Sequence, residues 1–332
     1  MKKILMIGTG GTIASEMTDS GLAPELTTEQ LLARIPAISR ICEVDCLQLL
    51  NLDSTDVGPE HWLLLARCIR ERYDRYDGFV VTHGTDTMAY TAAALSYLIQ
   101  NGPKPIVLTG AQKPIGFDST DSKDNLTDAF RCAAEDMPGV AIVFNHKVIL
   151  GTRARKTRSK SFQAFSSINY PDLGVLRDGV LLRYIRQDCA AAPTFYDRLD
   201  SHVALLKLIP GMDRSVADFL LERNDALVIE SFGVGGLPEA GGFFDCVSRW
   251  MAAGKVVVLT TQVANEGSDL GVYHVGYRLK SDLQVLEAYD MTTEAVTAKL
   301  MWILGQTRDL VQVERLFYAP VARDILWPQE LR

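Results

Sequence analysis

The chain has 332 residues, of which 47% are hydrophobic and 23% charged, so it is long enough for two globular domains of unequal size. Its net charge of −7 disfavours nucleic acid and anionic membranes as partners, and no apolar run approaches the roughly 20 residues of a membrane span. The six cysteines form no CxxC pair and have no neighbouring histidine cluster, so we expect free thiols and no metal site.

Short runs rich in Val and Ile alternate along the chain with amphipathic helical patterns. The first run, Ile4–Ile7, is shorter than the roughly 7–15 residues of a signal-peptide core, so we expect a buried strand and a cytoplasmic protein. Further strands are expected at Gly78–Thr82, Pro105–Leu108, Val140–Phe144, Ala226–Glu230 and Lys255–Thr260. Helices are expected at Pro59–Tyr73, Thr87–Gln100, Ser122–Glu135 and Asp213–Glu222. This alternation predicts an α/β fold whose mostly parallel sheet is covered by helices on both faces.

The alternation breaks between about Asp188 and Gly211, where the one strand-like run is His202–Leu208. We therefore expect an N-terminal α/β domain over residues 1–188, a linker over 189–210, and a smaller parallel-sheet α/β domain over 211–332. Ligands of open parallel sheets bind beyond the carboxyl ends of the strands. Polar residues that directly follow apolar strands are therefore the candidate functional residues.

The first candidate segment is GTGGTIAS, residues 8–15. Its glycines allow a sharp turn that would bring Thr12 just past the first strand, facing the crevice. A plain glycine turn or a dinucleotide-binding fingerprint are the alternatives. The segment lacks the GxGxxG spacing, and no convincing acidic residue closes a second strand about 20 residues later, which disfavours a nicotinamide-dependent oxidoreductase.

The turn after the second strand carries Thr82, His83, Thr85, Asp86 and Thr87. Thr85 and Asp86 would lie at a helix N-terminus, next to unpaired backbone N–H groups. A helix cap needs one such residue, so the surplus favours a functional role, with His83 more suited to stabilising the turn. A third polar stretch, Asp53–Asp56, is by itself typical of a cap before the helix that begins at Pro59.

A basic cluster, Gly151–Lys160, lies in mid-chain. It is short, lacks interleaved aromatic residues and belongs to an acidic protein, so it does not indicate nucleic-acid binding. A desolvated lysine near threonines and carboxylates can instead act as a base.

Two separated segments, GTGGTIAS at 8–15 and VVTHGTDTMAYTAAALS at 80–96, resemble the signature segments of the bacterial-type L-asparaginases, most closely their cytoplasmic branch. The resemblance extends through TGAQKPI, GTRARK, IESFGVGG and DMTTEAVTAKL. It implies that Thr12 attacks the side-chain amide of L-asparagine and forms an ester. It also implies that Thr85, Asp86 and Lys156 form a hydrogen-bonded set similar to a serine-hydrolase triad.

The same resemblance implies a substrate-binding set. Asp86 would also hold the α-ammonium group, the Ser54 loop the α-carboxylate, and backbone N–H groups the oxyanion, which gives Asp53, Ser54, Thr55, Gly84 and Ala111 as binding residues. No cofactor is implied. A homodimer or homotetramer is implied, in which the turn at 232–236 packs near a neighbouring subunit's site.

The stretch Ala14–Glu25 suits a mobile lid over the site. Many relatives carry a tyrosine in this lid, and Leu22 stands in the corresponding place. The prediction is hydrolysis of L-asparagine, with glutamine as a weaker substrate. A non-catalytic asparagine sensor is the alternative that the loss of the tyrosine raises. The amidase subunit of a tRNA-dependent amidotransferase is another, although that protein normally has an extra domain before the first motif, which here starts at Gly8.

Overall fold

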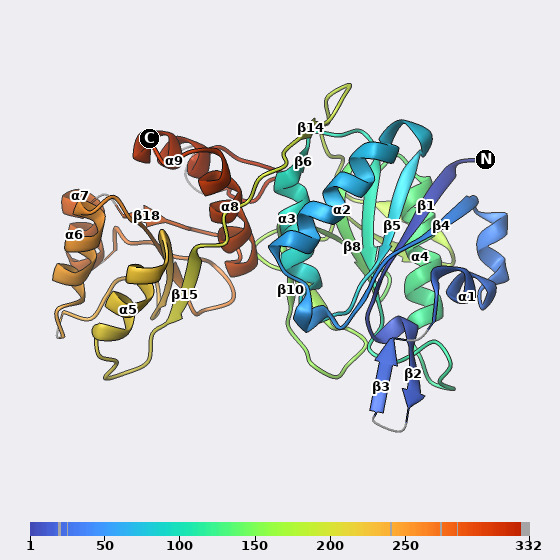
Figure 1. Cartoon of the computed structure of the whole chain (residues 1–332), viewed down its shortest axis with the longest axis horizontal. Helices are drawn as coiled ribbons and strands as arrows, with labels where there is room; N and C mark the ends of the chain where they lie inside the picture. Colours follow the sequence, from blue (N-terminus) through green and yellow to red (C-terminus); the bar gives the residue numbers. More distant parts are fainter. Residues whose placement is uncertain (19–20, 25, 240, 273, 284, 327–332) are drawn as a thin grey trace. The chain divides into compact units, whose positions relative to one another are not determined.

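The computed structural model describes residues 1–332 except 19–20, 25, 240, 273, 284 and 327–332, and it leaves the side chains of 17, 18, 21–24 and 275 undescribed. The chain forms two compact units, Met1–Asp197 and Arg198–Arg332 (Figure 1). This boundary falls inside the stretch 189–210 that we expected as a linker. Strand β15 (Val203–Lys207) lies in that stretch and pairs with the sheet of the second unit, which therefore begins before residue 211.

The first unit is built on an eight-stranded sheet with the order β13-β12-β9-β8-β7-β5-β1-β4. Its strands are β1 (Lys3–Gly10), β4 (Glu43–Leu52), β5 (Gly78–Thr82), β7 (Pro105–Thr109), β8 (Gly139–Phe144), β9 (Lys147–Leu150), β12 (Gly174–Arg177) and β13 (Val180–Arg183). The five neighbouring strands β4, β1, β5, β7 and β8 are parallel to one another. Each of the remaining strands, β9, β12 and β13, is antiparallel to the strand before it in this order. The mostly parallel sheet predicted from the sequence is confirmed.

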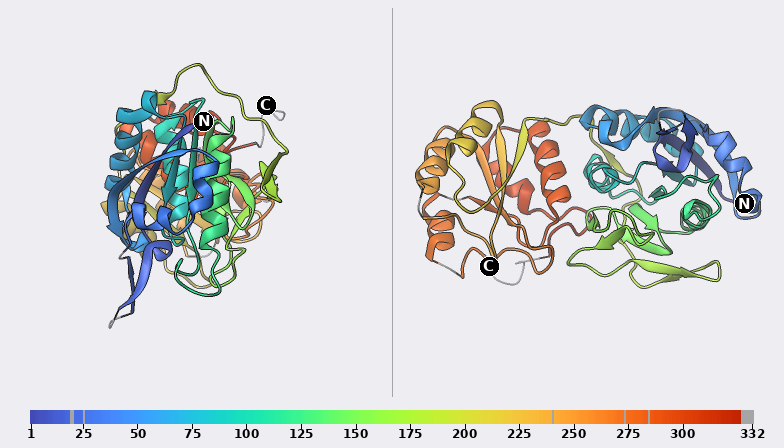
Figure 2. Two further views of the ribbon diagram at one scale, coloured as in Figure 1. Left: turned by 90° about the vertical axis from the view of Figure 1, so that its right-hand side faces the viewer. Right: turned by 90° about the horizontal axis from the view of Figure 1, so that it is seen from below.

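Helices cover both faces of this sheet (Figures 1 and 2). They are α1 (Thr28–Ala33), α2 (Pro59–Arg72), α3 (Met88–Leu98) and α4 (Ser122–Ala134). Side chains alternate along a strand, so Met6 and Val80 point to the face where they pack in one core cluster with Leu126 and Phe130 of α4. The central strands β1, β5, β7 and β8 are buried on both faces, which explains why they read as continuous apolar runs.

Three two-stranded sheets complete the first unit. They pair β2 (Ser15–Thr18) with β3 (Gly21–Pro24), β10 (Ala154–Lys156) with β11 (Phe165–Ser167), and β6 (Ile99–Gln100) with β14 (Thr194–Phe195). The predicted lid, Ala14–Glu25, therefore contains an antiparallel hairpin, which projects from the body of the unit in Figure 1. The side chain of Leu22 lies outside the described residues, so its predicted role stays a prediction.

The second unit contains a four-stranded parallel sheet with the order β15-β16-β17-β18. Besides β15, its strands are β16 (Ala226–Ser231), β17 (Val256–Thr261) and β18 (Leu286–Glu287). Its helices are α5 (Ser215–Arg223), α6 (Phe243–Ala252), α7 (His274–Leu283), α8 (Thr293–Gln306) and α9 (Leu310–Tyr318). Leu227 and Val257 of the sheet pack with Ala217 of α5 and Val247 of α6 in this unit's core, which confirms the smaller parallel-sheet α/β domain. Within the part of the chain that the structure describes, no helix is long and apolar enough to cross a membrane.

Candidate active site

Four loops meet at one edge of the large sheet. Strands β4, β1, β5 and β7 are neighbours and run parallel, so their carboxyl ends lie side by side. The loops that leave these ends contain the segments 11–12, 53–55, 83–87 and 110–112. This is the place where open parallel sheets bind ligands.

A glycine allows the loops at 11–12 and 83–87 to approach closely. Gly11 has a positive φ of 81°, and a Cβ atom on it would lie 2.3 Å from the backbone nitrogen of Gly84. A residue with a side chain would force the loops apart. Thr12 follows Gly11 at the start of a short 3-10 helix, Thr12–Ala14, and is partly buried. The close approach therefore places the backbone at Thr12 next to the turn that carries Thr85.

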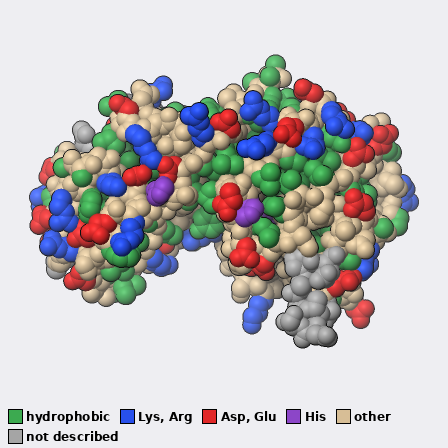
Figure 3. Space-filling view, in the orientation of Figure 1, with side chains coloured by type: hydrophobic (Ala, Val, Ile, Leu, Met, Phe, Trp, Pro, Cys, Tyr) green, Lys and Arg blue, Asp and Glu red, His purple; other side chains and the backbone are tan. Residues whose placement is uncertain are grey.

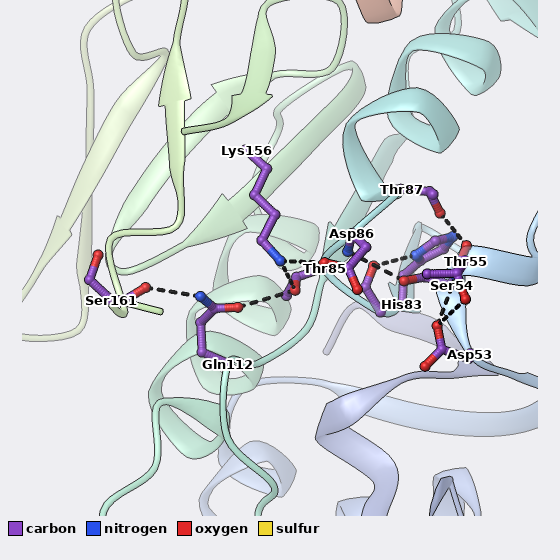
Figure 4. Close-up of polar contacts among 11 residues, drawn as sticks. Asp53, Ser54, Thr55, His83, Thr85, Asp86, Thr87, Gln112, Lys156 and Ser161 are labelled. Carbon is purple, nitrogen blue, oxygen red and sulfur yellow. Dashed lines mark hydrogen bonds and ion pairs between the residues drawn. The ribbon is translucent and has the colours of Figure 1, made fainter. Parts of the chain in front are cut away.

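Lys156 and two residues of this turn form a hydrogen-bonded set (Figure 4). The Lys156 ammonium nitrogen donates to Thr85 Oγ1 at 2.7 Å and to Asp86 Oδ1 at 2.6 Å. Thr85 is buried, whereas the Asp86 side chain is 57% exposed and therefore accessible to a ligand. Lys156 ends β10, far along the chain from the turn, so only the fold brings these three side chains together.

Gln112 joins this set from the loop after β7. The Thr85 hydroxyl donates to Gln112 Oε1 at 3.1 Å, and Gln112 Nε2 donates to the carbonyl oxygen of Ser161 at 3.2 Å (Figure 4). Gln112 was not among the predicted site residues. The signal that could have found it is its place, three residues after the end of a buried strand at the same sheet edge.

The Ser54 loop lies against the other side of the Thr85 turn. Ser54 is buried, its hydroxyl oxygen accepts from the Asp86 N–H at 3.3 Å, and its carbonyl oxygen accepts from the Thr87 hydroxyl at 2.6 Å. Among the described residues, the Ser54 hydroxyl accepts a bond but donates none. A Cβ atom on Gly84 would lie 2.5 Å from Ser54 Oγ, so this position too requires glycine.

Asp53 and Thr55 bond to each other at the start of the same loop. One oxygen of the Asp53 carboxylate accepts from the Thr55 N–H at 2.9 Å and from its hydroxyl at 2.8 Å. Both residues are exposed, and Asp53 caps the short helix Ser54–Asp56. The structure therefore shows a local structural role for Asp53 beside the binding role implied by resemblance.

The side chain of His83 is buried next to the turn that carries Thr85. Its Nδ1 lies 2.7 Å from the Gly84 carbonyl oxygen, and its Nε2 lies 3.0 Å from Thr91 Oγ1, which also accepts from the Trp62 indole N–H at 3.0 Å. Because a carbonyl can only accept, Nδ1 carries the hydrogen and Nε2 accepts from Thr91. Burial lowers the pKa of His83 to about 4, so the ring is neutral. These bonds give His83 the turn-stabilising role that we expected.

The described residues offer one cluster with metal-ligand geometry, Asp200, His202 and Asp225 in the second unit. Arg308 pairs with both of its carboxylates, and Lys255 pairs with Asp225. These cations already neutralise the cluster, so it gives no support for a metal site.

The protein thus consists of two α/β units, the first of which groups hydroxyls, an ammonium and a carboxylate at the carboxyl ends of its parallel strands. The chain belongs to the asparaginase family. Residues 3–188 match the family described as asparaginase, N-terminal, and residues 202–317 match the glutaminase/asparaginase C-terminal domain.

Individual relatives cover nearly the whole chain. It is similar to the L-asparaginase of Thermococcus kodakarensis, with 41% identity over 97% of this chain and 99% of that protein. The solved structure of the thermostable L-asparaginase from that organism superposes with a TM-score of 0.92 at 39% identity, covering 98% of this chain and 100% of that one. L-asparaginase 1 of Escherichia coli is 34% identical over 95% of both chains.

Another relative is a subunit of the glutamyl-tRNA(Gln) amidotransferase of Pyrococcus furiosus. It is 34% identical over 97% of this chain and 76% of that protein. The chain is thus similar both to L-asparaginases and to an amidotransferase component.

Proposed function

We propose that this protein hydrolyses L-asparagine to L-aspartate and ammonia through an ester on a threonine. The observation that carries the proposal is the hydrogen-bonded Lys156–Thr85–Asp86 set, which belongs in part to a turn packed closely against Gly11, the residue before Thr12. An amide is a poor electrophile and a hydroxyl a poor nucleophile, so the reaction needs a base and an oxyanion site as well as an attacking oxygen.

Recognition of a free amino acid requires opposite charges at its two ends. The accessible Asp86 carboxylate would accept from the α-ammonium group, and the Ser54 hydroxyl would donate to the α-carboxylate. Thr55 and the backbone of Gly84 and Asp53 would complete this end of the pocket. With these contacts made, the side-chain amide would lie toward Thr12 and Thr85.

In the first half-reaction, Thr12 Oγ attacks the amide carbon and its proton passes to the departing nitrogen. The C–N bond breaks, ammonia leaves, and an ester to Thr12 remains. The N–H groups of Thr85 and Ala111 would stabilise the oxyanion, since both residues are buried at the crevice and neither N–H has a backbone acceptor among the described residues.

In the second half-reaction, water attacks the ester carbon. Thr85 and Lys156 would together accept the water proton, and the Thr12 oxygen leaves with a proton. The products are L-aspartate and the free Thr12 hydroxyl. We propose no cofactor for either step.

We further propose that the protein is a homodimer or a dimer of dimers. Support comes from apolar side chains exposed beyond the carboxyl ends of the second unit's strands, at Ile209, Phe232, Val234 and Val263. Figure 3 shows hydrophobic side chains at the surface of the molecule. Light scattering coupled to size-exclusion chromatography tests this, and a monomer at micromolar concentration would refute it.

The proposed location is the cytoplasm, supported by six free thiols.

The deciding experiment measures ammonia release from L-asparagine, with L-glutamine and D-asparagine alongside. The variants are Thr12→Ala and, as a matched control, Thr127→Ala, whose exposed hydroxyl bonds to a carbonyl of its own helix α4. We expect turnover of L-asparagine that falls by about 10³-fold or more in Thr12→Ala and stays unchanged in the control.

Other outcomes identify the competing functions. A folded wild-type protein that binds L-asparagine without turnover would indicate a sensor. Turnover that requires a glutamyl-tRNA substrate would indicate the role of the amidotransferase relatives. An acyl adduct on Thr85 in place of Thr12 would reverse the two threonines' roles.

A further inference from the structure

The loop after β7, residues 110–113, is held by two buried side chains at the start of α4. The Asp121 carboxylate accepts from the Gln112 N–H, at 3.1 and 3.0 Å to its two oxygens, and from the Lys113 N–H at 3.1 Å. The Asn125 amide donates to the Gly110 carbonyl at 3.0 Å and to Asp121 at 3.1 Å. Asp121 is 6% exposed and Asn125 1%. The loop has no regular secondary structure, so its conformation depends on these bonds together with those that the Ser122 and Thr120 hydroxyls donate to the Lys113 carbonyl oxygen, at 2.6 and 2.9 Å.

Asp121 occupies the N-cap position of α4 without capping that helix. An Asp at this position normally accepts from an N–H of the first turn of its own helix. Thr27, Thr292 and Asp309 do so at the starts of α1, α8 and α9, whereas α4 has no side-chain cap bond. The Asp121 carboxylate is directed to the neighbouring loop instead.

That loop carries the side chain that touches Thr85. Gln112 Oε1 accepts the Thr85 hydroxyl proton, and the bond from Gln112 Nε2 to Ser161 fixes which end of the amide faces Thr85. The ammonium of Lys156 donates to the same Thr85 oxygen. The Thr85 proton therefore points to Gln112, and an oxygen lone pair points to Lys156.

We propose that Asp121 is a positioning residue for catalysis: it fixes the loop 110–113 so that Gln112 accepts the Thr85 hydroxyl proton and an oxygen lone pair of Thr85 faces Lys156. This inference rests on the proposed hydrolysis. Asp121 does not touch the substrate, and its effect passes through Gln112. A purely structural role would instead change stability and leave the rate per folded molecule unchanged.

The test compares Asp121→Asn with Asp118→Asn, an exposed aspartate of the same connection between β7 and α4. Both changes remove one negative charge, but only Asp121→Asn puts an amide beside the backbone N–H groups of the loop. We expect Asp121→Asn to lower kcat for L-asparagine by about ten- to a hundredfold with KM changed less than about threefold, and Asp118→Asn to have no effect.

A double-mutant cycle identifies the route of the effect. Gln112→Ala should lower kcat to a similar degree, and the Asp121→Asn/Gln112→Ala variant should lose little more than either single variant, because both act through one contact. Multiplicative losses, or wild-type kcat in folded Asp121→Asn, would overturn the proposal. If Asp121→Asn does not fold, Asp121→Ser replaces it, since its hydroxyl can accept from only part of the loop, and the same outcomes apply.

Amide hydrogen exchange gives a readout that does not depend on turnover. Peptides covering residues 110–117 should exchange faster in Asp121→Asn than in the wild type and in Asp118→Asn. If the wild type shows no turnover, the proposed function is wrong. The exchange difference would still test whether Asp121 fixes the conformation of the loop 110–113. Equal exchange in the three proteins would overturn the positioning role.

Discussion

Gly11 lies where two loops of the candidate site approach closely, so its substitution by alanine is a sensitive test of the site's geometry. Its φ of 81° and ψ of 176° are conformations that a residue with a side chain rarely adopts, at a cost of about 1–3 kcal/mol. The added Cβ would lie 2.3 and 2.5 Å from the nitrogen and Cα of Gly84 and 2.9 Å from the carbonyl carbon of His83. These are backbone atoms, which cannot rotate away. Carbon atoms pack at about 3.5–4.0 Å, so the two loops must separate by roughly 1 Å.

A displacement of this size between the Thr12 and Thr85 loops should lower kcat about a hundredfold, because a catalytic geometry displaced by ~1 Å loses about that factor. The matched control is Gly139→Ala. Gly139 has a φ of 88° and lies at the opposite, amino end of β8, and its added Cβ would meet only the side-chain oxygen of Gln187 at 3.1 Å. It should lose only the part of the free energy of unfolding that comes from backbone strain, while keeping its kcat.

The assay combines ammonia release from L-asparagine at saturating substrate with urea denaturation of each variant. The comparison separates backbone strain, which both variants share, from loop displacement, which only Gly11→Ala has. A Gly11→Ala protein that is destabilised but turns over at the wild-type rate would refute the claim that the closeness of these loops sets the catalytic geometry.

Three further predictions concern titration and charge. The pKa of His83 is lowered to about 4 by burial, so the unfolded chain binds its proton first as pH falls from 6.5. Stability of the first unit should therefore fall by roughly 3 kcal/mol between pH 6.5 and 4, and His83→Gln should remove that part of the slope in urea denaturation. Lys299 and Asp324 form a fully buried ion pair at 2.7 Å, so Lys299→Met should lower the free energy of unfolding by about 3–5 kcal/mol in urea denaturation. Lys255→Met, at a partly exposed pair, should lower it by only about 0–1 kcal/mol. Equal losses in these two variants would contradict the role of burial. Lys156→Arg should keep the positive charge but abolish turnover, because a guanidinium does not release its proton, and near-normal ammonia release would exclude Lys156 as a base.

Most strands that are buried on both faces were predictable from the sequence, although β9 was missed, and most half-exposed strands were not, although β15 was recognised as a strand-like run. β5 and β16 were predicted within one residue of their observed bounds, because a short continuous apolar run between polar turns is typical of a buried strand. Strand β4 was not predicted, because it is the edge strand and mixes apolar with polar residues on a partly exposed surface. The antiparallel hairpin β12–β13 was missed for the same reason.

The sequence by itself determined the class of fold, the two units and the polar segments after the strands, because strand burial and glycine turns depend on residues close together in the chain. Only the tertiary structure decided which of these polar groups meet. Lys156 reaches Thr85 and Asp86 from a separate small sheet, and Gln112 joins them from another loop. Asp121 would read from the sequence as the cap of α4, yet its carboxylate bonds to the loop beside Thr85. The local sequence pattern predicts that Asp121 caps its own helix. The packing of that helix against the loop determines that its carboxylate instead accepts hydrogen bonds from the loop.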